Sequence, residues 1–164
     1  MPEIARLGLD ALEPLRELLR ICWTDTYTGI LPDAVIRTAI ETWQSKDAVS
    51  SGLSNPNAYY AGYFEDGALR GMVAARMIDN STLRIAQLYV HPEHQRKGIG
   101  RKLMDAAVGH FDKAITATLE VEEGNPKGVA FYRKYGFDYP SKTIVKVGTY
   151  EIPCLVGVLR LTRS

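Results

Sequence analysis

Residues 83–111 read LRIAQLYVHPEHQRKGIGRKLMDAAVGHF and combine two hydrophobic patterns of different period. Residues 83–90 are rich in apolar and aromatic side chains and are followed by Pro92, which predicts a buried strand. In residues 99–111 the apolar side chains recur at helical spacing, which predicts one face of an amphipathic helix. The chain is therefore expected to pass from strand to helix through a short, basic junction that contains glycine.

The junction is Gln95-Arg96-Lys97-Gly98-Ile99-Gly100, and Arg101 follows it at the predicted helix N-terminus. Backbone N–H groups at a helix N-terminus lack intrahelical partners and lie at the positive end of the helix dipole. Glycines at positions 98 and 100 let an anion approach the backbone, so we predict a phosphate or pyrophosphate site here. The alternative interpretation is a simple turn with a solvated basic face. The dinucleotide fingerprint Gly-x-Gly-x-x-Gly is absent, and so is a P-loop.

Two motifs further along the chain extend this pattern: Asn125, and the run AFYRKYGF at residues 130–137. Together with Gln95-Arg96-x-Gly98-x-Gly100 after a strand, they resemble the GNAT superfamily of acyl-CoA-dependent N-acyltransferases. The resemblance covers residues 83–137. It implies acetyl-CoA as the cosubstrate, with its pyrophosphate bound by residues 95–101.

The resemblance also implies how the rest of the cosubstrate binds. In this family the strand at residues 83–90 and the strand at residues 115–121 run parallel and then splay apart. Splaying leaves backbone groups of Leu88 and Val90 without strand partners, so Leu88, Tyr89 and Val90 are expected to bind the pantetheine arm. Asn125 is expected to donate or accept a hydrogen bond near that arm, and the alternative is that it caps its loop.

Periodicity and turn residues predict the remaining elements. They are a strand at 4–7, helices at 11–23 and 33–43, strands at 58–64 and 69–78, a strand at 115–121, a helix at 127–135, and strands at 143–147 and 152–161. Residues 44–57 are expected to be mostly connection, with a helical turn considered around residues 48–53. This order is GNAT-like and predicts an α/β (α+β) fold, with a central mixed, mostly antiparallel sheet, helices on both faces and splayed parallel central strands. Residues 1–164 are expected to form a single N-acetyltransferase domain.

Acetyl transfer from a thioester to an amine requires an acid for the leaving thiolate, and Tyr132 is our candidate. A phenol with a pKa of about 10 is protonated at pH 7, and a thiolate with a pKa of about 8.5 can accept its proton. The resemblance places Tyr132 at the family's catalytic tyrosine. The alternative is an aromatic side chain that packs on Phe131 or Phe137.

No general base is evident in the sequence. Many GNAT proteins carry a glutamate on the strand at residues 83–90, where this chain has Gln87, which cannot take a proton. Glu120 and Glu122 share one face of a strand and could act through water, or could be exposed. His91 and His94 have suitable ordinary pKa values but are expected to lie on a turn surface.

The acceptor pocket is expected near residues 23–32, WTDTYTGILP, which resemble a bacterial subgroup that includes polyamine acetyltransferases. Asp25 could attract a cationic amine, and Trp23 or Tyr27 could face it. Alternatively, Asp25 caps the loop and the aromatic side chains belong to the core. Tyr150 and Glu151 are secondary candidates for this pocket.

Composition restricts the partners and the compartment. The formal net charge of +1 gives no overall field that would recruit nucleic acid or an acidic membrane. Cys22 and Cys154 lack metal-ligand spacing, so we expect reduced, buried thiols, no metal and a cytoplasmic protein. No apolar run approaches the roughly twenty residues of a membrane span. The oligomeric state stays open, with a homodimer among the states considered.

The sequence thus predicts an N-acetyltransferase that transfers the acetyl group of acetyl-CoA to a primary amine, with a small molecule such as a polyamine as the acceptor. Three alternatives remain at this point. They are acetylation of a protein N-terminus or lysine, a non-catalytic acyl-CoA-binding regulatory module, and a nucleotide-binding domain unrelated to coenzyme A.

Overall fold

The computed structural model describes residues 2–162, whose strands form one seven-stranded sheet in the order β1-β2-β3-β4-β5-β7-β6. The strands are β1 (Glu3–Arg6), β2 (Ala58–Glu65), β3 (Ala68–Met77), β4 (Thr82–Val90), β5 (Thr116–Glu122), β6 (Asp138–Val147) and β7 (Tyr150–Arg160). The helices are α1 (Leu12–Tyr27), α2 (Asp33–Trp43), α3 (Lys46–Ser54), α4 (Ile99–His110) and α5 (Pro126–Tyr135), with short 3-10 turns η1 (Leu9–Ala11) and η2 (Pro92–His94). Met1, Arg163 and Ser164, which the single-domain prediction includes, lie outside the described residues.

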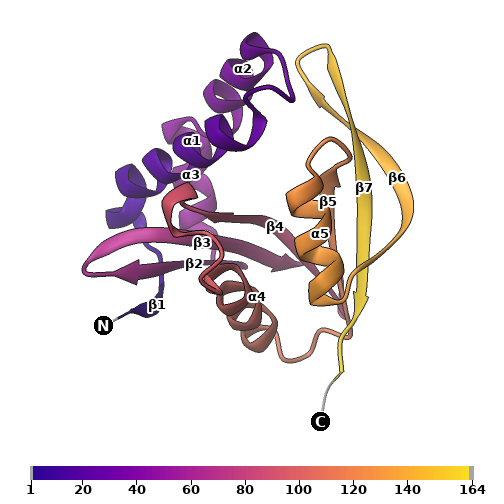
Figure 1. The fold of residues 1–164 in the computed structure, drawn as a ribbon. Helices are drawn as coiled ribbons and strands as arrows, with labels where there is room; N and C mark the ends of the chain where they lie inside the picture. Colours follow the sequence, from indigo (N-terminus) through magenta and orange to yellow (C-terminus); the bar gives the residue numbers. More distant parts are fainter. Residues whose placement is uncertain (1, 163–164) are drawn as a thin grey trace.

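Helices cover both faces of the sheet, as predicted (Figure 1). On one face, Leu15 and Leu19 of α1 and Val49 of α3 pack with Met72 of β3. On the other face, the next residue of β3, Val73, packs in a second cluster with buried residues of α4 and β5. Alternate residues of one strand point to opposite faces, so β3 supplies both cores at once.

The central strands separate as the family resemblance implied. β4 and β5 pair in parallel only at Thr82, Leu83 and Arg84, opposite residues 116–118. Beyond Arg84, β4 stays paired with β3 alone and β5 with β7, and Figure 1 shows the two halves of the sheet diverging. All other strand pairs among the described residues are antiparallel, so the prediction of a mixed, mostly antiparallel sheet is confirmed.

One predicted connection is a helix. Residues 44–57 were expected to be mostly irregular, yet α3 occupies Lys46–Ser54. The Ser45 hydroxyl accepts a hydrogen bond from the Ala48 N–H at 3.1 Å, which satisfies one of the free donors of the first turn. Val49 then buries its side chain against α1. Packing of a single apolar residue therefore outweighs a polar local sequence.

Most other boundaries fall close to those predicted, but β6 begins at Asp138, well before the predicted start at Thr143. α1 runs to Tyr27, four residues past Trp23, because Tyr27 is buried in a third apolar cluster with residues of α2 and the β6–β7 hairpin. The β2–β3 hairpin turns at Asp66 and Gly67, both with positive φ, as an Asp-Gly hairpin turn requires. No helix among residues 2–162 is long and apolar enough to cross a bilayer.

The fold predicts that truncating a buried side chain of α4 lowers the stability of the protein strongly. Leu103 is fully buried between α4 and the sheet, whereas Ile115 is 49% exposed. Leu103→Ala should lower the free energy of unfolding by about 2–5 kcal/mol, because it leaves a cavity, whereas we expect Ile115→Ala to change it by less than about 0.5 kcal/mol. Urea denaturation of both variants provides the measurement, and equal effects would contradict the placement of α4.

Candidate active site

The separation of β4 and β5 opens into a cavity of about 1130 Å³. Residues from α1, β4, the start of α4, β5, α5 and the β6–β7 hairpin line it, so segments distant in sequence meet there. The lining brings together most of the predicted site residues: Trp23, Asp25, Tyr27, Leu88, Tyr89, Val90, Gln95, Arg96, Gly98, Ile99, Gly100, Arg101, Asn125 and Tyr132. Lys97, Tyr150 and Glu151 do not belong to the lining.

The segment before α4 opens a helix, as predicted. Gly98 is its N-cap in the left-handed conformation, with φ +81°, and Arg96 also has a positive φ of 65°. The N–H of Lys102 donates to Gly98 O at 3.1 Å, so the N–H groups of Ile99, Gly100 and Arg101 come before the first intrahelical bond. The first turn holds no acidic residue and the N-cap has no side-chain hydrogen bond. The N-terminus of α4 can therefore receive an anion.

Gly98 and Gly100 are required for different structural reasons. Gly98 needs its positive φ, and a Cβ there would meet nothing within 4 Å, so the space beside it is open. A Cβ at Gly100 would instead lie 3.2 Å from the Phe131 ring. Gly100 therefore lets α5 pack closely against the start of α4, a role that the expectation of anion approach did not include.

The basic side chains divide between the cavity and the outer surface. Arg96, Arg101 and Lys134 line the cavity, and the Arg101 guanidinium also lies 5.3 Å from the centre of the Tyr135 ring. Arg133 is not part of the lining and lies over the Tyr139 ring at 5.2 Å.

The free edge of β4 is partly occupied. Gln95 Nε2 donates to the Val90 carbonyl at 3.1 Å, so the expectation that this carbonyl is unpaired is wrong. This hydrogen bond joins the segment before α4 to the end of β4, so Gln95 has a structural role. Leu88 and Tyr89 lie on the part of β4 that has no β5 partner, and both line the cavity.

Asn125 is the N-cap of α5. Its Oδ1 accepts a hydrogen bond from the Gly128 N–H at 3.1 Å, so the capping interpretation is confirmed. A Cβ at Gly128 would lie 2.6 Å from Asn125 Nδ2, and glycine leaves the room that this cap requires. Because Asn125 also lines the cavity, the cap fixes a polar side chain at its edge.

Tyr132 both packs and faces the cavity. Its ring contacts Phe131 and Phe137 edge to face, with ring centres 5.3 and 5.9 Å apart, so the packing interpretation is correct. The same residue lines the cavity. Burial, and then the charge of Glu122, raises the pKa of the Tyr132 phenol above its ordinary value, so the phenol holds its proton.

Glu122 is surrounded by three tyrosines from different elements, a cluster that the sequence did not reveal. Burial is the first cause that raises the pKa of Tyr27 and Tyr89, and the Glu122 carboxylate raises both further, as it does for Tyr132. Trp23 Nε1 donates to the Tyr89 hydroxyl at 2.9 Å and holds that ring in place. The period-two pattern of β5 was the only signal for Glu122.

Glu120 has a different environment from Glu122, although both side chains lie on the same face of β5. Its carboxylate forms an ion pair with Arg84, which lies at the last paired position of β4. The pair therefore joins the two strands where they begin to separate. Gln87 lines the cavity from β4, at the side where a glutamate was expected.

The opposite end of the cavity is aromatic. Trp23 contacts Tyr27 with ring centres 4.2 Å apart and Trp43 at 5.6 Å. Trp23 and Tyr27 are only 4% and 3% exposed, so they are core residues that also line the cavity, whereas Asp25 is exposed at its edge. Gln44, beside Trp43, is a lining residue that no sequence pattern indicated.

The two cysteines are free, buried thiols, as expected, and both belong to the cavity lining. Burial raises the pKa of Cys22 and Cys154 to about 12, and nearby carboxylates add to the effect. Both thiols are therefore protonated at neutral pH and behave as apolar lining.

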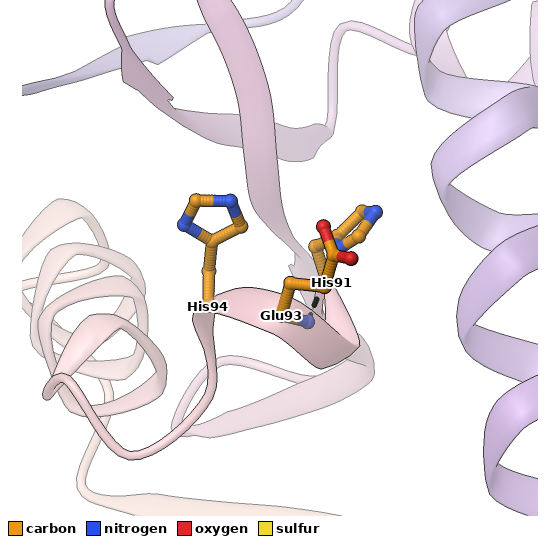
Figure 2. Close-up of side chains that lie close together, drawn as sticks. All are labelled: His91, Glu93 and His94. Atoms are coloured by element: carbon orange, nitrogen blue, oxygen red, sulfur yellow. Dashed lines mark hydrogen bonds between the residues drawn. The ribbon is translucent and has the colours of Figure 1, made fainter.

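A histidine cluster lies on the η2 turn (Figure 2). His91, Glu93 and His94 offer ligand atoms within 4.8 Å of one another, although zinc ligands at about 2.1 Å lie only roughly 3.4 Å apart. His91 Nδ1 already accepts from the Glu93 N–H at 3.1 Å. Burial and the positive charges of Arg70 and Lys97 lower the pKa of His94. The expectation that no metal takes part stays a prediction.

The environment of Tyr132 predicts its titration. Because its pKa is raised, the neutral phenol should persist past pH 10, near which free tyrosine ionises. The unfolded chain ionises first, so this residue contributes stability below about pH 10 that is lost as the pH rises further. Carbon-13 NMR of labelled tyrosine, compared with Tyr132→Phe, identifies the resonance. Ionisation at or below the pH of free tyrosine would contradict the structure.

Comparison with known proteins places this geometry in a family. A model described as the acetyltransferase (GNAT) family matches residues 12–137. Spermidine N(1)-acetyltransferase of Thermoplasma acidophilum is 32% identical over 141 residues, which cover 82% of this chain and 87% of that protein. Ribosomal protein bS18 alanine N-acetyltransferase of Escherichia coli K12 is 36% identical over 73 residues, 42% of this chain and 49% of that protein.

Solved structures agree with the fold. The crystal structure of PaiA N-acetyltransferase from Thermoplasma acidophilum in complex with coenzyme A has a TM-score of 0.82 at 27% identity, covering 98% of this chain and 99% of that chain. The Escherichia coli ribosomal-protein-S18-alanine N-acetyltransferase, at 16% identity and a TM-score of 0.75, shares the fold and covers 100% of this chain and 96% of that chain. The chain belongs to the GNAT family and is an acetyl-CoA-dependent N-acetyltransferase.

Proposed function

We propose that the acceptor is the primary amine of a small cationic molecule of the polyamine class. The observation that carries this proposal is the Glu122 carboxylate among Tyr27, Tyr89 and Tyr132 inside the cavity. A carboxylate attracts an ammonium group, and tyrosine faces accept a cation. The spermidine N(1)-acetyltransferase from Thermoplasma acidophilum, similar over most of the chain, supports the same acceptor class.

The shape of the acceptor end favours a small molecule over a protein. Val147 of β6 and Ile152 of β7 pack with Ile36 of α2, so the β6–β7 hairpin reaches across to α2 (Figure 1). A peptide chain needs an open groove for its following residues. The similarity to the bS18 alanine N-acetyltransferase, which covers 42% of this chain, keeps a protein N-terminus as the second candidate.

The donor end of the cavity suits acetyl-CoA. We place the pyrophosphate on the free N–H groups at the start of α4, with Arg96 and Arg101 beside it. The pantetheine arm then follows β4 past Leu88, where strand pairing with β5 has ended. Asn125 fixes the far edge of the same channel. This arrangement directs the thioester toward Tyr132.

The residues around the thioester supply both proton transfers. The ammonium group first loses one proton to water. The neutral amine then attacks the thioester carbonyl carbon, and its nitrogen passes a second proton to Glu122, directly or through water. Breaking of the C–S bond then releases the amide and a thiolate, which takes the proton of the Tyr132 phenol. The charge of Glu122 acts on the Tyr132 phenol, and the proton held by Glu122 returns to the phenolate through water, which completes the cycle.

Removing the proposed acid provides the first test of the mechanism. Tyr132→Phe keeps the ring that packs on Phe131 and Phe137 and removes only the hydroxyl. We expect the turnover number to fall roughly 10²- to 10⁴-fold, with the affinity for acetyl-CoA unchanged. Thiol release measured over a panel of alkylamines, polyamines and peptides reports this. Unchanged turnover with every acceptor and at every pH would remove the acid role.

The two carboxylates of β5 form a matched pair for the second test. Glu122→Gln should lower kcat/KM for a polyamine by roughly 10²-fold, because the amide cannot take the proton of the amine. Glu120→Gln removes an equal charge from the same face of β5, but that charge belongs to the ion pair with Arg84. The decrease in kcat/KM should therefore be smaller than for Glu122→Gln. A larger loss for Glu120→Gln would assign the proton path to that residue instead.

A further inference from the structure

Gln44 is the buried polar side chain at the end of α2, and it is only 4% exposed. Its main chain is fully engaged: the N–H donates to Ile40 O at 3.0 Å, and the carbonyl accepts from Arg16 Nε at 3.1 Å. The side-chain Oε1 is buried and has no hydrogen-bond partner among the described residues. Buried hydrogen-bond acceptors normally have a donor, so this unpaired oxygen indicates that a bound molecule supplies one.

The oxygen belongs to a residue that lines the acceptor end of the cavity. The adjacent Trp43 contacts Trp23, and Trp23 donates to the Tyr89 hydroxyl, which lies near Glu122. An aromatic wall, formed by Trp43, Trp23 and Tyr89, therefore runs from Gln44 toward the reacting centre. A ligand that reaches both Glu122 and Gln44 must extend along this wall.

Charge in the cavity is unevenly distributed. The basic lining residues that the structure describes come from β4, α4, α5 and the segments before these helices: Arg84, Arg96, Arg101, Lys127, Lys134 and His94. The lining residues of α1 and α2 include Asp25 and no Lys or Arg. The rings of Trp23 and Trp43 favour a cation at the Gln44 end, and the guanidinium of Arg16, which donates to the main-chain carbonyl of Gln44, lies outside the lining.

We propose that Gln44 Oε1 accepts a hydrogen bond from a second, protonated nitrogen of the acceptor, and that Gln44 thereby selects diamines and polyamines over monoamines. This inference rests on the proposed function and adds a distal subsite to it. The acetylated nitrogen lies at Glu122 and Tyr132, and the second nitrogen lies beside Gln44 and Trp43.

The test compares α,ω-diaminoalkanes with monoalkylamines of equal chain length. In the wild-type protein, kcat/KM for the preferred diamine should exceed that for its monoamine. Gln44→Met keeps the length of the side chain and removes the amide, so this preference should fall roughly tenfold, mainly through KM for the diamine. The value of kcat/KM for the monoamine should fall by a smaller factor than kcat/KM for the diamine. A preference that survives Gln44→Met would overturn the proposal.

A charge-adding variant makes the test independent of lost packing. Gln44→Glu places a carboxylate at the subsite and should lower KM for the diamine but not for the monoamine. Thr42→Glu is the matched control, because Thr42 is exposed on the same helix and outside the cavity lining. If both variants change the diamine KM equally, the effect is general electrostatics and the proposal fails.

Binding separates this inference from the proposed function. Calorimetry of a diamine with the coenzyme A-loaded protein measures the subsite without turnover, and wild-type affinity for coenzyme A confirms that each variant is folded. Diamine binding that weakens in Gln44→Met supports the subsite even if no amine is acetylated. Acetylation of monoamines and diamines with equal efficiency, unaffected by Gln44→Met, would refute the subsite and leave small-amine acetylation standing.

Discussion

The parting of β4 from β5 after Arg84 is the constraint on which the rest of the site depends. Pairing is limited to residues 82–84 and 116–118, and the Arg84–Glu120 ion pair joins the strands at that point. Each strand keeps its outer partner, so the sheet stays continuous while a cavity opens at its centre. A backbone edge inside a folded protein needs hydrogen-bond partners, and a ligand with amides supplies them.

The two ends of that cavity have opposite chemistry because different elements build them. The donor end receives the N-terminus of α4, where Gly98 takes a left-handed conformation and Gly100 lets α5 pack close by. The acceptor end receives α1 and α2, which contribute aromatic rings and a buried amide. In the proposed function, the anionic coenzyme and a cationic amine approach from opposite sides. Glu122 and Tyr132 lie where these two approaches meet.

Much of this could be predicted from sequence, because local signals and family motifs coincide between residues 83 and 137. The strand, the helix after Gly98 and the position of Tyr132 each depend on short-range pattern, and the structure contains them. For α3 the sequence suggested only a helical turn around residues 48–53, since the helix is stabilised by Val49 and Leu53 packing on the α1 side of the sheet, which no local pattern shows. Gln44 and the surroundings of Glu122 were missed for a related reason. The environment of each residue is formed by side chains that lie far away in the sequence.

The central claim is that coenzyme A occupies the gap between β4 and β5 with its pyrophosphate on the α4 N-terminus. Titration of nitrogen-15-labelled protein with coenzyme A, followed by amide NMR, tests it most directly. We predict the largest shifts at the amides of residues 97–101, with further shifts along β4 at Leu88. Unmoved amides there, with shifts instead on the outer face of α5 around Val129 and Arg133, would contradict the account.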